Sequence, residues 1–283
     1  MMRIVSELSA LRAQVSEWKR AGQRVGFVPT MGNLHAGHFS LVRLARTHVE
    51  RVVASVFVNP TQFGPNEDFD RYPRTPDADA SGLQSAGCDL LWLPSVQTMY
   101  PHGPEATVQV RVPAVTEVLE GAHRPGHFDG VATVVTRLFN QVQPDVAVFG
   151  RKDFQQLAVI RYLVSDLAIP VELVGADTMR ETDGLAMSSR NQYLTAEQRP
   201  VAAEIHRTLQ SVRAAVVAGA DMAGAENEAR ATLERHGFAV DYVAIRRPDL
   251  TAAGPGKVGR VVVLVAARLG QTRLIDNLEF DAS

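Results

Sequence analysis

Two histidines stand close together directly after a short apolar segment near the start of the chain. His35 and His38 are three residues apart, so they share a face if a helix begins around them. Free backbone N–H groups and the positive end of the helix dipole would lie beside them. Imidazoles add donors that can be cationic. The pattern therefore predicts an anion site at this turn; the alternative is that the histidines only cap a helix.

Further polar groups follow other predicted strands. Lys152 comes just after Gly150 and could supply a point charge for phosphate. Gln62 and Gln156 carry uncharged donors and acceptors that could hold a hydroxy acid. Residues 187–190 (Met-Ser-Ser-Arg) offer two hydroxyls and a guanidinium in a polar loop. Taken singly, each has a structural alternative: a solvated lysine, a surface glutamine or an ordinary loop.

Several common catalytic patterns are missing from the sequence. Neither the P-loop pattern nor Gly-x-Gly-x-x-Gly is found, which argues against a P-loop kinase and a typical dinucleotide enzyme. No paired cysteines or His-Glu-x-x-His pattern supports a zinc site. No Ser-His-Asp or Cys-His arrangement is evident. The histidine turn, Lys152, the two glutamines and the Met-Ser-Ser-Arg loop, taken together, indicate ATP bound near His35 and His38, with cations around its phosphates.

The composition limits the class of protein. Of 283 residues, 46% are apolar and 21% charged, a globular balance, and the net charge of −2 gives no reason to expect a nucleic-acid partner. Cys88 is the only cysteine, so no internal disulfide can form, which suits the cytosol. No segment approaches the ~18 apolar residues of a membrane helix. We therefore expect a cytoplasmic protein without a targeting segment or membrane partner.

Apolar segments and helical patterns alternate through the first part of the chain. Strands are predicted at residues 25–28, 51–58, 89–93, 145–149 and 169–174, and helices at 5–19, from 39 onward, and at 77–86, 131–141 and 154–166. Pro29 should end its strand, because proline cannot donate a ladder hydrogen bond. Residues 59–65 and 120–130 read as loops, and 108–118 as ambiguous. This alternation predicts an α/β fold: a doubly wound, Rossmann-like parallel sheet whose turns after residues 30, 58 and 150 converge at one edge.

The pattern changes after Gly175. Residues 180–191 are polar and rich in turn formers, and 252–259 reads as a loop. Helices are predicted at 195–218 and 223–236, followed by strands at 240–245, 260–266 and 272–277. We therefore expect two domains: residues 1–178 form a Rossmann-like domain, and residues 179–283 form a smaller C-terminal α+β domain.

Six motifs in order resemble the pantothenate synthetases, or pantoate–β-alanine ligases. The first is Pro29-Thr30-Met31-Gly32-Asn33-Leu34-His35-Ala36-Gly37-His38. The others are residues 57–63 (Phe-Val-Asn-Pro-Thr-Gln-Phe), 72–75 (Tyr-Pro-Arg-Thr), 124–128 (Arg-Pro-Gly-His-Phe), 149–156 (Phe-Gly-Arg-Lys-Asp-Phe-Gln-Gln) and 183–191 (Asp-Gly-Leu-Ala-Met-Ser-Ser-Arg-Asn). That family shares its His-x-Gly-His motif with class I aminoacyl-tRNA synthetases and cytidylyltransferases. The set is far more specific than the histidine turn alone.

The resemblance implies a reaction and a set of site residues. ATP and pantoate would give pantoyl adenylate and pyrophosphate, and β-alanine would then displace AMP to give pantothenate, the coenzyme A precursor. The implied catalytic residues are His35, His38 and Lys152. The implied ATP-binding residues are Met31, Gly32, Asn33, Leu34, His35, Ala36, Gly37, His38, Gly150, Arg151, Lys152, Asp153, Met179, Met187, Ser188, Ser189 and Arg190. The implied pantoate and β-alanine residues are Thr30, Met31, Gln62, Arg124, His127 and Gln156. The resemblance thus implies that residues 1–178 form the ATP- and pantoate-binding domain and residues 179–283 the lid domain.

The family pattern also implies Mg²⁺, held through the ATP phosphates without a protein metal site, and a homodimer. Two positions depart from it: Met179 stands where valine is usual, and Arg151 where glutamate is expected. Two other functions share the histidine turn. One is nucleotidyl transfer onto a phosphorylated alcohol, as in cytidylyltransferases, and the other is a non-catalytic nucleotide sensor. The Gln62 and Gln156 segments speak against the first, and retention of Lys152 and the Met-Ser-Ser-Arg loop against the second.

Overall fold

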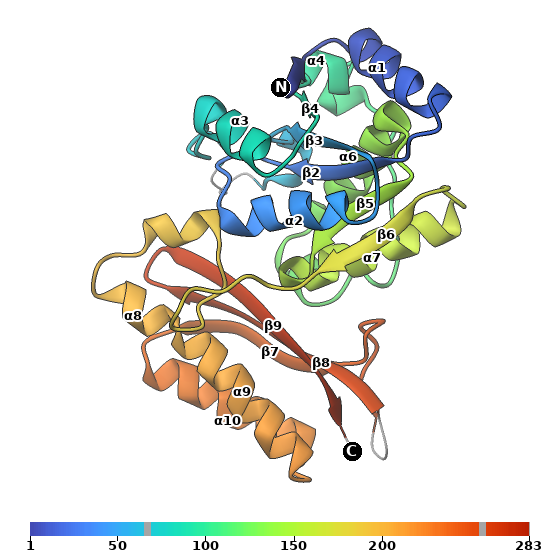
Figure 1. The fold of residues 1–283 in the computed structure, drawn as a ribbon. Coiled ribbons are helices and arrows are strands. Elements are labelled where there is room, and N and C mark those ends of the chain that lie inside the picture. Colours follow the sequence, from blue (N-terminus) through green and yellow to red (C-terminus); the bar gives the residue numbers. More distant parts are fainter. Residues whose placement is uncertain (65–68, 255–258, 283) are drawn as a thin grey trace. The chain divides into compact units, whose positions relative to one another are not determined.

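The computed structural model describes residues 1–64, 69–254 and 259–282. The chain forms two compact units (Figure 1). The first consists of residues 1–151 and 159–177, and the second of residues 152–158 and 178–283. Parts of the loops predicted at 59–65 and 252–259 lie outside the described residues.

A six-stranded parallel sheet forms the centre of the first unit. Its strands are β1 (Arg3–Val5), β2 (Val25–Thr30), β3 (Arg51–Val56), β4 (Leu90–Trp92), β5 (Val146–Gly150) and β6 (Glu172–Ala176). They lie in the order β1-β4-β3-β2-β5-β6, and every pair is parallel. The chain thus winds outward in both directions from β2, and the predicted doubly wound α/β class is confirmed.

Helices cover both faces of this sheet (Figure 1). The helices of this part are α1 (Leu8–Arg20), α2 (Ala36–Arg46), α3 (Pro76–Ser85), α4 (Val96–Met99), α5 (Glu120–His123), α6 (His127–Val142) and α7 (Phe154–Asp166). Helices α2 and α3 pack together, and α1 packs against α6. The buried face of α2 contributes Val42 and Ala45 to a core that also contains Val28, Val52 and Leu91.

The prediction that Pro29 ends its strand is wrong. Strand β2 continues to Thr30, with Pro29 opposite Ser55 of β3. On its other side β2 pairs with β5 only at Gly26 and Phe27. Proline is accommodated because the ladder with β5 has already ended where the missing N–H would be needed.

Two other expectations need correction. Strand β1 was not predicted; its last residue, Val5, is the first residue of the helix predicted at 5–19, which instead begins at Leu8. Three residues are too few for a periodic signal, and β1 is fixed by pairing with β4. The segment 120–130 is not all loop, because α5 lies within it and α6 begins at His127. Gly126, with φ of +80°, allows the chain to turn into α6.

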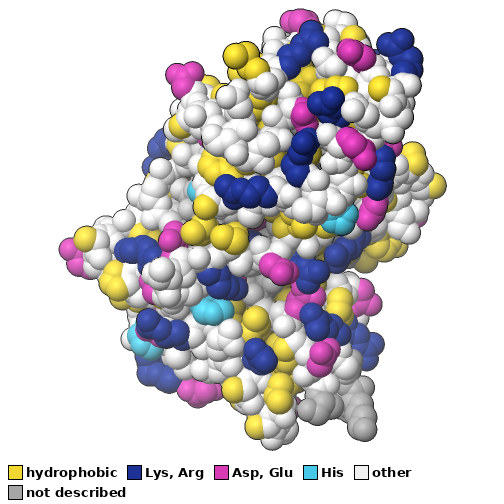
Figure 2. All heavy atoms as spheres, viewed as in Figure 1, with side chains coloured by type: hydrophobic (Ala, Val, Ile, Leu, Met, Phe, Trp, Pro, Cys, Tyr) yellow, Lys and Arg dark blue, Asp and Glu magenta, His cyan; other side chains and the backbone are white. Residues whose placement is uncertain are grey.

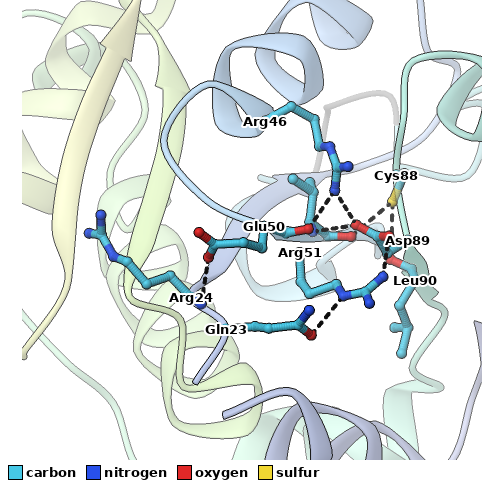
Figure 3. Close-up of polar contacts among 9 residues, drawn as sticks. Gln23, Arg24, Arg46, Glu50, Arg51, Cys88, Asp89 and Leu90 are labelled. Carbon is cyan, nitrogen blue, oxygen red and sulfur yellow. Dashed lines mark hydrogen bonds and ion pairs between the residues drawn. The ribbon is translucent and has the colours of Figure 1, made fainter. Parts of the chain in front are cut away.

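Carboxylates cap the amino ends of the central strands (Figure 3). Asp89 accepts hydrogen bonds from the Val52 N–H at 2.8 Å, from Arg46 at 2.7 Å and from Arg51 at 3.1 Å. The neighbouring Cys88 thiol donates to the Leu90 carbonyl oxygen, and burial raises its pKa to about 12. A thiol held protonated in this way is a poor nucleophile.

The second unit is a three-stranded antiparallel sheet with helices. Strands β7 (Ala239–Arg246), β8 (Gly259–Leu269) and β9 (Thr272–Ala282) lie in that order and are longer than predicted. Helices α9 (Glu204–Val217) and α10 (Met222–Arg235) share a core with them. The single helix predicted at 195–218 is divided, because a separate α8 (Gln198–Ala202) precedes α9. Pro200 removes one backbone donor from that short helix.

Candidate functional site

The turn after β2 is built from two residues with positive φ. Gly32 has φ of +90° and Asn33 φ of +50°. The N–H groups of Asn33 and Leu34 both donate to the carboxylate of Asp79 on α3, at 3.0 and 2.8 Å. A side chain at position 32 would lie 3.2 Å from that carboxylate, besides being strained at its φ. The sequence pattern Met-Gly-Asn thus forms a compact turn closed by a buried acid.

His35 and His38 form a reciprocal cap at the start of α2. The Nδ1 atom of His35 accepts from the Gly37 N–H at 3.2 Å, and Nδ1 of His38 accepts from the His35 N–H at 3.3 Å. Their ring centroids lie 4.1 Å apart. Because each Nδ1 is an acceptor here, a neutral ring carries its proton on Nε2. The two Nε2–H groups are therefore donors of defined direction.

The expectation of free N–H groups at this helix start is wrong in detail. Those of Asn33 and Leu34 are bound by Asp79, and those of His35 and Gly37 by imidazole nitrogens. Sequence reasoning missed Asp79 because it stands in an ordinary helical segment. These four amides therefore already have acceptors within the protein.

Gln62 is held at both ends of its side-chain amide. It lies at the end of a short 3-10 turn, Pro60–Gln62, after β3. Its Nε2 donates to the Met31 sulfur at 3.1 Å, and its Oε1 accepts from Asn59 Nδ2 at 3.1 Å. Tyr100, whose pKa is raised by burial, donates from its hydroxyl to Asn59 Oδ1 at 2.5 Å. Sequence reasoning missed this Tyr100–Asn59 support, since the two residues are far apart in the chain.

Arg124 and His127 lie on the same side of the Gln62 backbone. The carbonyl oxygen of Gln62 accepts from His127 Nδ1 at 2.8 Å, and Arg124 Nη1 lies 3.0 Å from His127 Nε2. With the carbonyl oxygen accepting from Nδ1 and the guanidinium donating to Nε2, both contacts fit the tautomer that carries its proton on Nδ1. Thr30 is buried, and its hydroxyl donates to the Ser55 carbonyl oxygen at 2.7 Å.

The segment after β5 contains the predicted lysine. A 3-10 turn, Arg151–Asp153, follows Gly150 and leads into α7. Arg151 Nε donates to the Gly175 carbonyl oxygen at 3.2 Å. The Lys152 carbonyl oxygen accepts from Asn277 Nδ2 at 2.8 Å, and its Nζ lies 3.8 Å from Asp153 Oδ1. Gln156 is half-buried on α7.

A small hairpin in the second unit brings together residues predicted to bind ATP. The Met187 N–H donates to the Met179 carbonyl oxygen at 2.9 Å, and Arg180 pairs with Ala186. Arg180 also makes a two-point contact with Asp276, at 2.6 and 3.0 Å. Next in the chain, Ser188 caps a 3-10 turn, Ser189–Tyr193, by accepting from the Arg190 N–H.

The predicted residues therefore fall into two groups. The first unit brings Met31, Gln62, Arg124 and His127 into one hydrogen-bonded cluster, of which Met31 lies four residues before His35. The second unit contains Lys152, Asp153 and Gln156 together with the hairpin residues. The convergence of the Lys152 turn with the histidine turn stays a prediction.

The described part of the chain contains neither a membrane-spanning helix nor a cluster of metal ligands. No helix there is both long and apolar enough to span a bilayer. No three His, Cys, Asp or Glu side chains gather as a metal site among those residues. On the face shown in Figure 2, positive and negative side chains are interspersed.

Comparison with known proteins gives full-length matches. A family model described as pantoate-beta-alanine ligase matches residues 3–279. Pantothenate synthetases of Stenotrophomonas maltophilia and Xylella fastidiosa are 63% and 64% identical, each over 99% of this chain and 100% of its own length. The crystal structure of pantothenate synthetase from Thermus thermophilus matches with a TM-score of 0.92 and 49% identity, covering 98% of this chain and 99% of that one.

A second crystal structure was solved with ligands. It is the pantoate-beta-alanine ligase of Francisella tularensis complexed with beta-gamma ATP and beta-alanine, with a TM-score of 0.82 and 32% identity. The match covers 98% of this chain and 97% of that one. The family model, the full-length relatives and the shared fold agree: the chain belongs to the pantoate–β-alanine ligase family.

Proposed function

We propose that this protein joins pantoate to β-alanine in two steps, through a pantoyl adenylate formed from ATP. As a pantoate–β-alanine ligase it is an ATP-dependent enzyme that forms a carbon–nitrogen bond. In the first step a pantoate carboxylate oxygen attacks the α-phosphorus, and the bond to the bridging oxygen breaks, releasing pyrophosphate. In the second, the β-alanine amine attacks the acyl carbon, AMP leaves with the electron pair, and the amine proton passes to solvent.

The reciprocal histidine cap is the observation that most directly supports adenylation. It fixes Nδ1 of both rings as acceptors and so directs two Nε2–H donors. Negative charge grows on the bridging and pyrophosphate oxygens during attack, and donors already in place stabilise it without reorganisation. We assign His35 and His38 to these oxygens, with residues 31–34, Ala36 and Gly37 supporting the nucleotide.

The Gln62 cluster is assigned to the acid and the amine. Gln62 presents an amide clamped by Met31 and Asn59. A clamped amide suits a hydroxy acid because its orientation is fixed before the ligand binds. Thr30, Arg124 and His127 complete this group, and Gln156 is assigned to pantoate. No group in this set is a strong base, so the free amine of β-alanine comes from solution.

The Lys152 turn and the loop after the 179–187 hairpin are also assigned to the nucleotide. We place Lys152 on the phosphates, with Gly150, Arg151 and Asp153 beside it, and Met179, Met187, Ser188, Ser189 and Arg190 in a loop that closes over ATP. Residues 1–178 are then the binding domain and 179–283 the lid. Mg²⁺ bound through the ATP phosphates would neutralise part of their charge. We further propose a cytoplasmic homodimer, which light scattering of the purified protein tests.

One labelling experiment tests the chemistry. Pantoate carrying oxygen-18 in its carboxylate should transfer label to AMP during turnover with ATP and β-alanine. Pantoate alone should support exchange of labelled pyrophosphate into ATP. ADP as product, or label in inorganic phosphate, would contradict adenylation. Binding of ATP without any AMP release would favour the nucleotide-sensor function, and pyrophosphate release with a phosphorylated alcohol would favour nucleotidyl transfer.

A further inference from the structure

The carboxylate of Asp79 is one of the few buried acids in the described part of the first unit. It is 2% exposed and lies on α3, outside every motif that the family resemblance supplied. It accepts from the Asn33 and Leu34 N–H groups and from the Thr75 hydroxyl at 3.0 Å. The neighbouring elements therefore direct three donors at one carboxylate.

The backbone it binds has an unusual conformation. Successive positive φ values at Gly32 and Asn33 turn the N–H groups of residues 33 and 34 to the same side. Such a concave arrangement of amides attracts an anion. A left-handed conformation at a non-glycine residue costs free energy and persists only where the surroundings hold it. Here the Asp79 carboxylate is the anion that holds it.

Helix α3 is built to deliver this carboxylate. Gly82 lets α3 approach α2 so closely that a Cβ there would lie 2.1 Å from the Phe39 ring. Thr75 is the N-cap residue of α3, yet its side chain makes no capping bond to the helix and donates instead to Asp79. A glycine inside the helix and a missing N-cap hydrogen bond both destabilise α3. Both features also fix the position of Asp79.

We propose that Asp79 is a positioning residue for adenylation: it locks the turn at residues 32–34 and so sets the direction of the His35–His38 cap. This inference rests on the proposed function of the two histidines. The His35 N–H, which donates to His38, follows directly after the two amides that Asp79 binds. A shift of the turn therefore moves the cap and both Nε2–H donors. Since productive geometry tolerates only about 0.5 Å of error, a small shift is costly.

The test compares Asp79→Asn with Asp145→Asn in the full-length protein. Asn keeps the size of Asp79 but offers one acceptor oxygen and places an NH₂ against a backbone donor. Asp145 is a matched control because it binds the Val25 N–H at 2.7 Å at the opposite end of β2, away from the proposed site. The assays are pantoate-dependent pyrophosphate exchange, thermal unfolding, and hydrogen exchange at residues 33 and 34.

We expect Asp79→Asn to raise the KM for ATP or lower kcat for exchange by roughly ten- to hundredfold, the size of one lost hydrogen bond to a charged group. The KM for pantoate should change less than about threefold, because the residues assigned to pantoate are not among the described hydrogen-bond donors to Asp79. Amides 33 and 34 should exchange faster. Asp145→Asn should lower the unfolding temperature and leave the kinetics of pyrophosphate exchange unchanged.

Thr75→Val covers the case in which Asp79→Asn does not fold. It keeps the carboxylate and removes one of its three donors, so it should shift ATP kinetics in the same direction by a smaller factor. The inference would be overturned if pyrophosphate exchange kept wild-type kinetics in a folded Asp79→Asn variant or in Thr75→Val. Equal losses in Asp79→Asn and Asp145→Asn would do the same, because stability alone would then explain them. A wild-type protein without pyrophosphate exchange would instead overturn the proposed function.

Discussion

Removing His35 or His38 deprives a different backbone N–H group of its acceptor. His38 accepts the backbone N–H of His35, whereas His35 accepts that of Gly37. His38→Ala therefore removes a donor from the proposed phosphate site and leaves the His35 N–H without its acceptor. We expect pyrophosphate exchange to fall by about one to two decades, the size of a charge-assisted contact made in the transition state.

The same variant separates the two half-reactions. Only adenylation develops charge on pyrophosphate, so aminolysis of preformed pantoyl adenylate should fall much less. That rate is measured by feeding the adenylate and β-alanine directly. Equal losses in the two half-reactions would remove His38 from the proposed phosphate site.

Lys152 gives a second prediction for a single residue. Its side chain is 18% exposed and has a carboxylate, Asp153, 3.8 Å away. Lys152→Ala should reduce adenylation at saturating substrates by about one to two decades, because the leaving pyrophosphate loses a positive partner. Lys19→Ala is the control: Lys19 pairs with Asp145 at the surface, and its loss should leave the rate unchanged. A Lys152→Ala enzyme with the wild-type rate contradicts the role assigned to Lys152.

Helices and strands that have a clear hydrophobic period could be predicted from the sequence. Features that depend on contacts with distant segments could not. The alternation of apolar segments was enough for the parallel sheet and for α7, whose bounds agree with the prediction. The early start of α6 was missed because His127 and Phe128 follow Gly126 and read as loop. Asp79 could not be selected from sequence, since its role depends on α3 lying against the turn after β2.

The Met179–Met187 hairpin depends on one ion pair. Asp276 is 4% exposed in its side chain, and Arg180 binds both its oxygens and the Gly184 carbonyl. Arg180→Ala should lower the free energy of unfolding by about 3 kcal/mol, because a buried carboxylate loses its partner. Urea unfolding measures the change. Adding Asp276→Asn should recover part of the loss, and strictly additive effects would refute the coupling.

The loop after the hairpin gives a prediction about ligand binding. Residues 187–190 combine two hydroxyls with a guanidinium, and we assign them to ATP. Amide hydrogen exchange over residues 183–191 should therefore slow when ATP and Mg²⁺ are added. The α10 amides serve as the internal reference and should not respond. Unchanged exchange at 183–191 in saturating ATP would refute the assignment of this loop.

Among the described residues, one buried core lies on the parallel sheet and another lies between β7–β9 and their helices. The net charge of the whole molecule, −2, is small, so pH acts on stability through individual groups more than through overall repulsion. Carboxylates such as Asp183 affect the free energy of unfolding at low pH. The Arg199 guanidinium that binds Asp183 lowers its pKa, and this contribution is lost only as pH falls through that lowered value.

His206 on α9 affects the free energy of unfolding at a higher pH than the carboxylates do. Its Nδ1 is buried without a hydrogen-bond partner among the described residues, and its ring lies against Gly184 of the hairpin. Burial lowers the pKa of His206, Arg180 lowers it further, and Asp276 opposes both. The unfolded chain therefore binds a proton at a pH where the folded chain does not. The free energy of unfolding should fall as pH drops below about 6.5, the ordinary histidine value.

A histidine-to-glutamine pair isolates this effect. One group contributes a slope of at most about 1.4 kcal/mol per pH unit, and only between the folded and unfolded pKa values. Urea midpoints measured from pH 7 to pH 5 should fall less steeply in His206→Gln than in the wild type. His236, exposed at the end of α10, supplies the control, so His236→Gln should keep the wild-type slope. Parallel slopes in wild type and His206→Gln would show that the buried ring does not set the acid sensitivity of the fold.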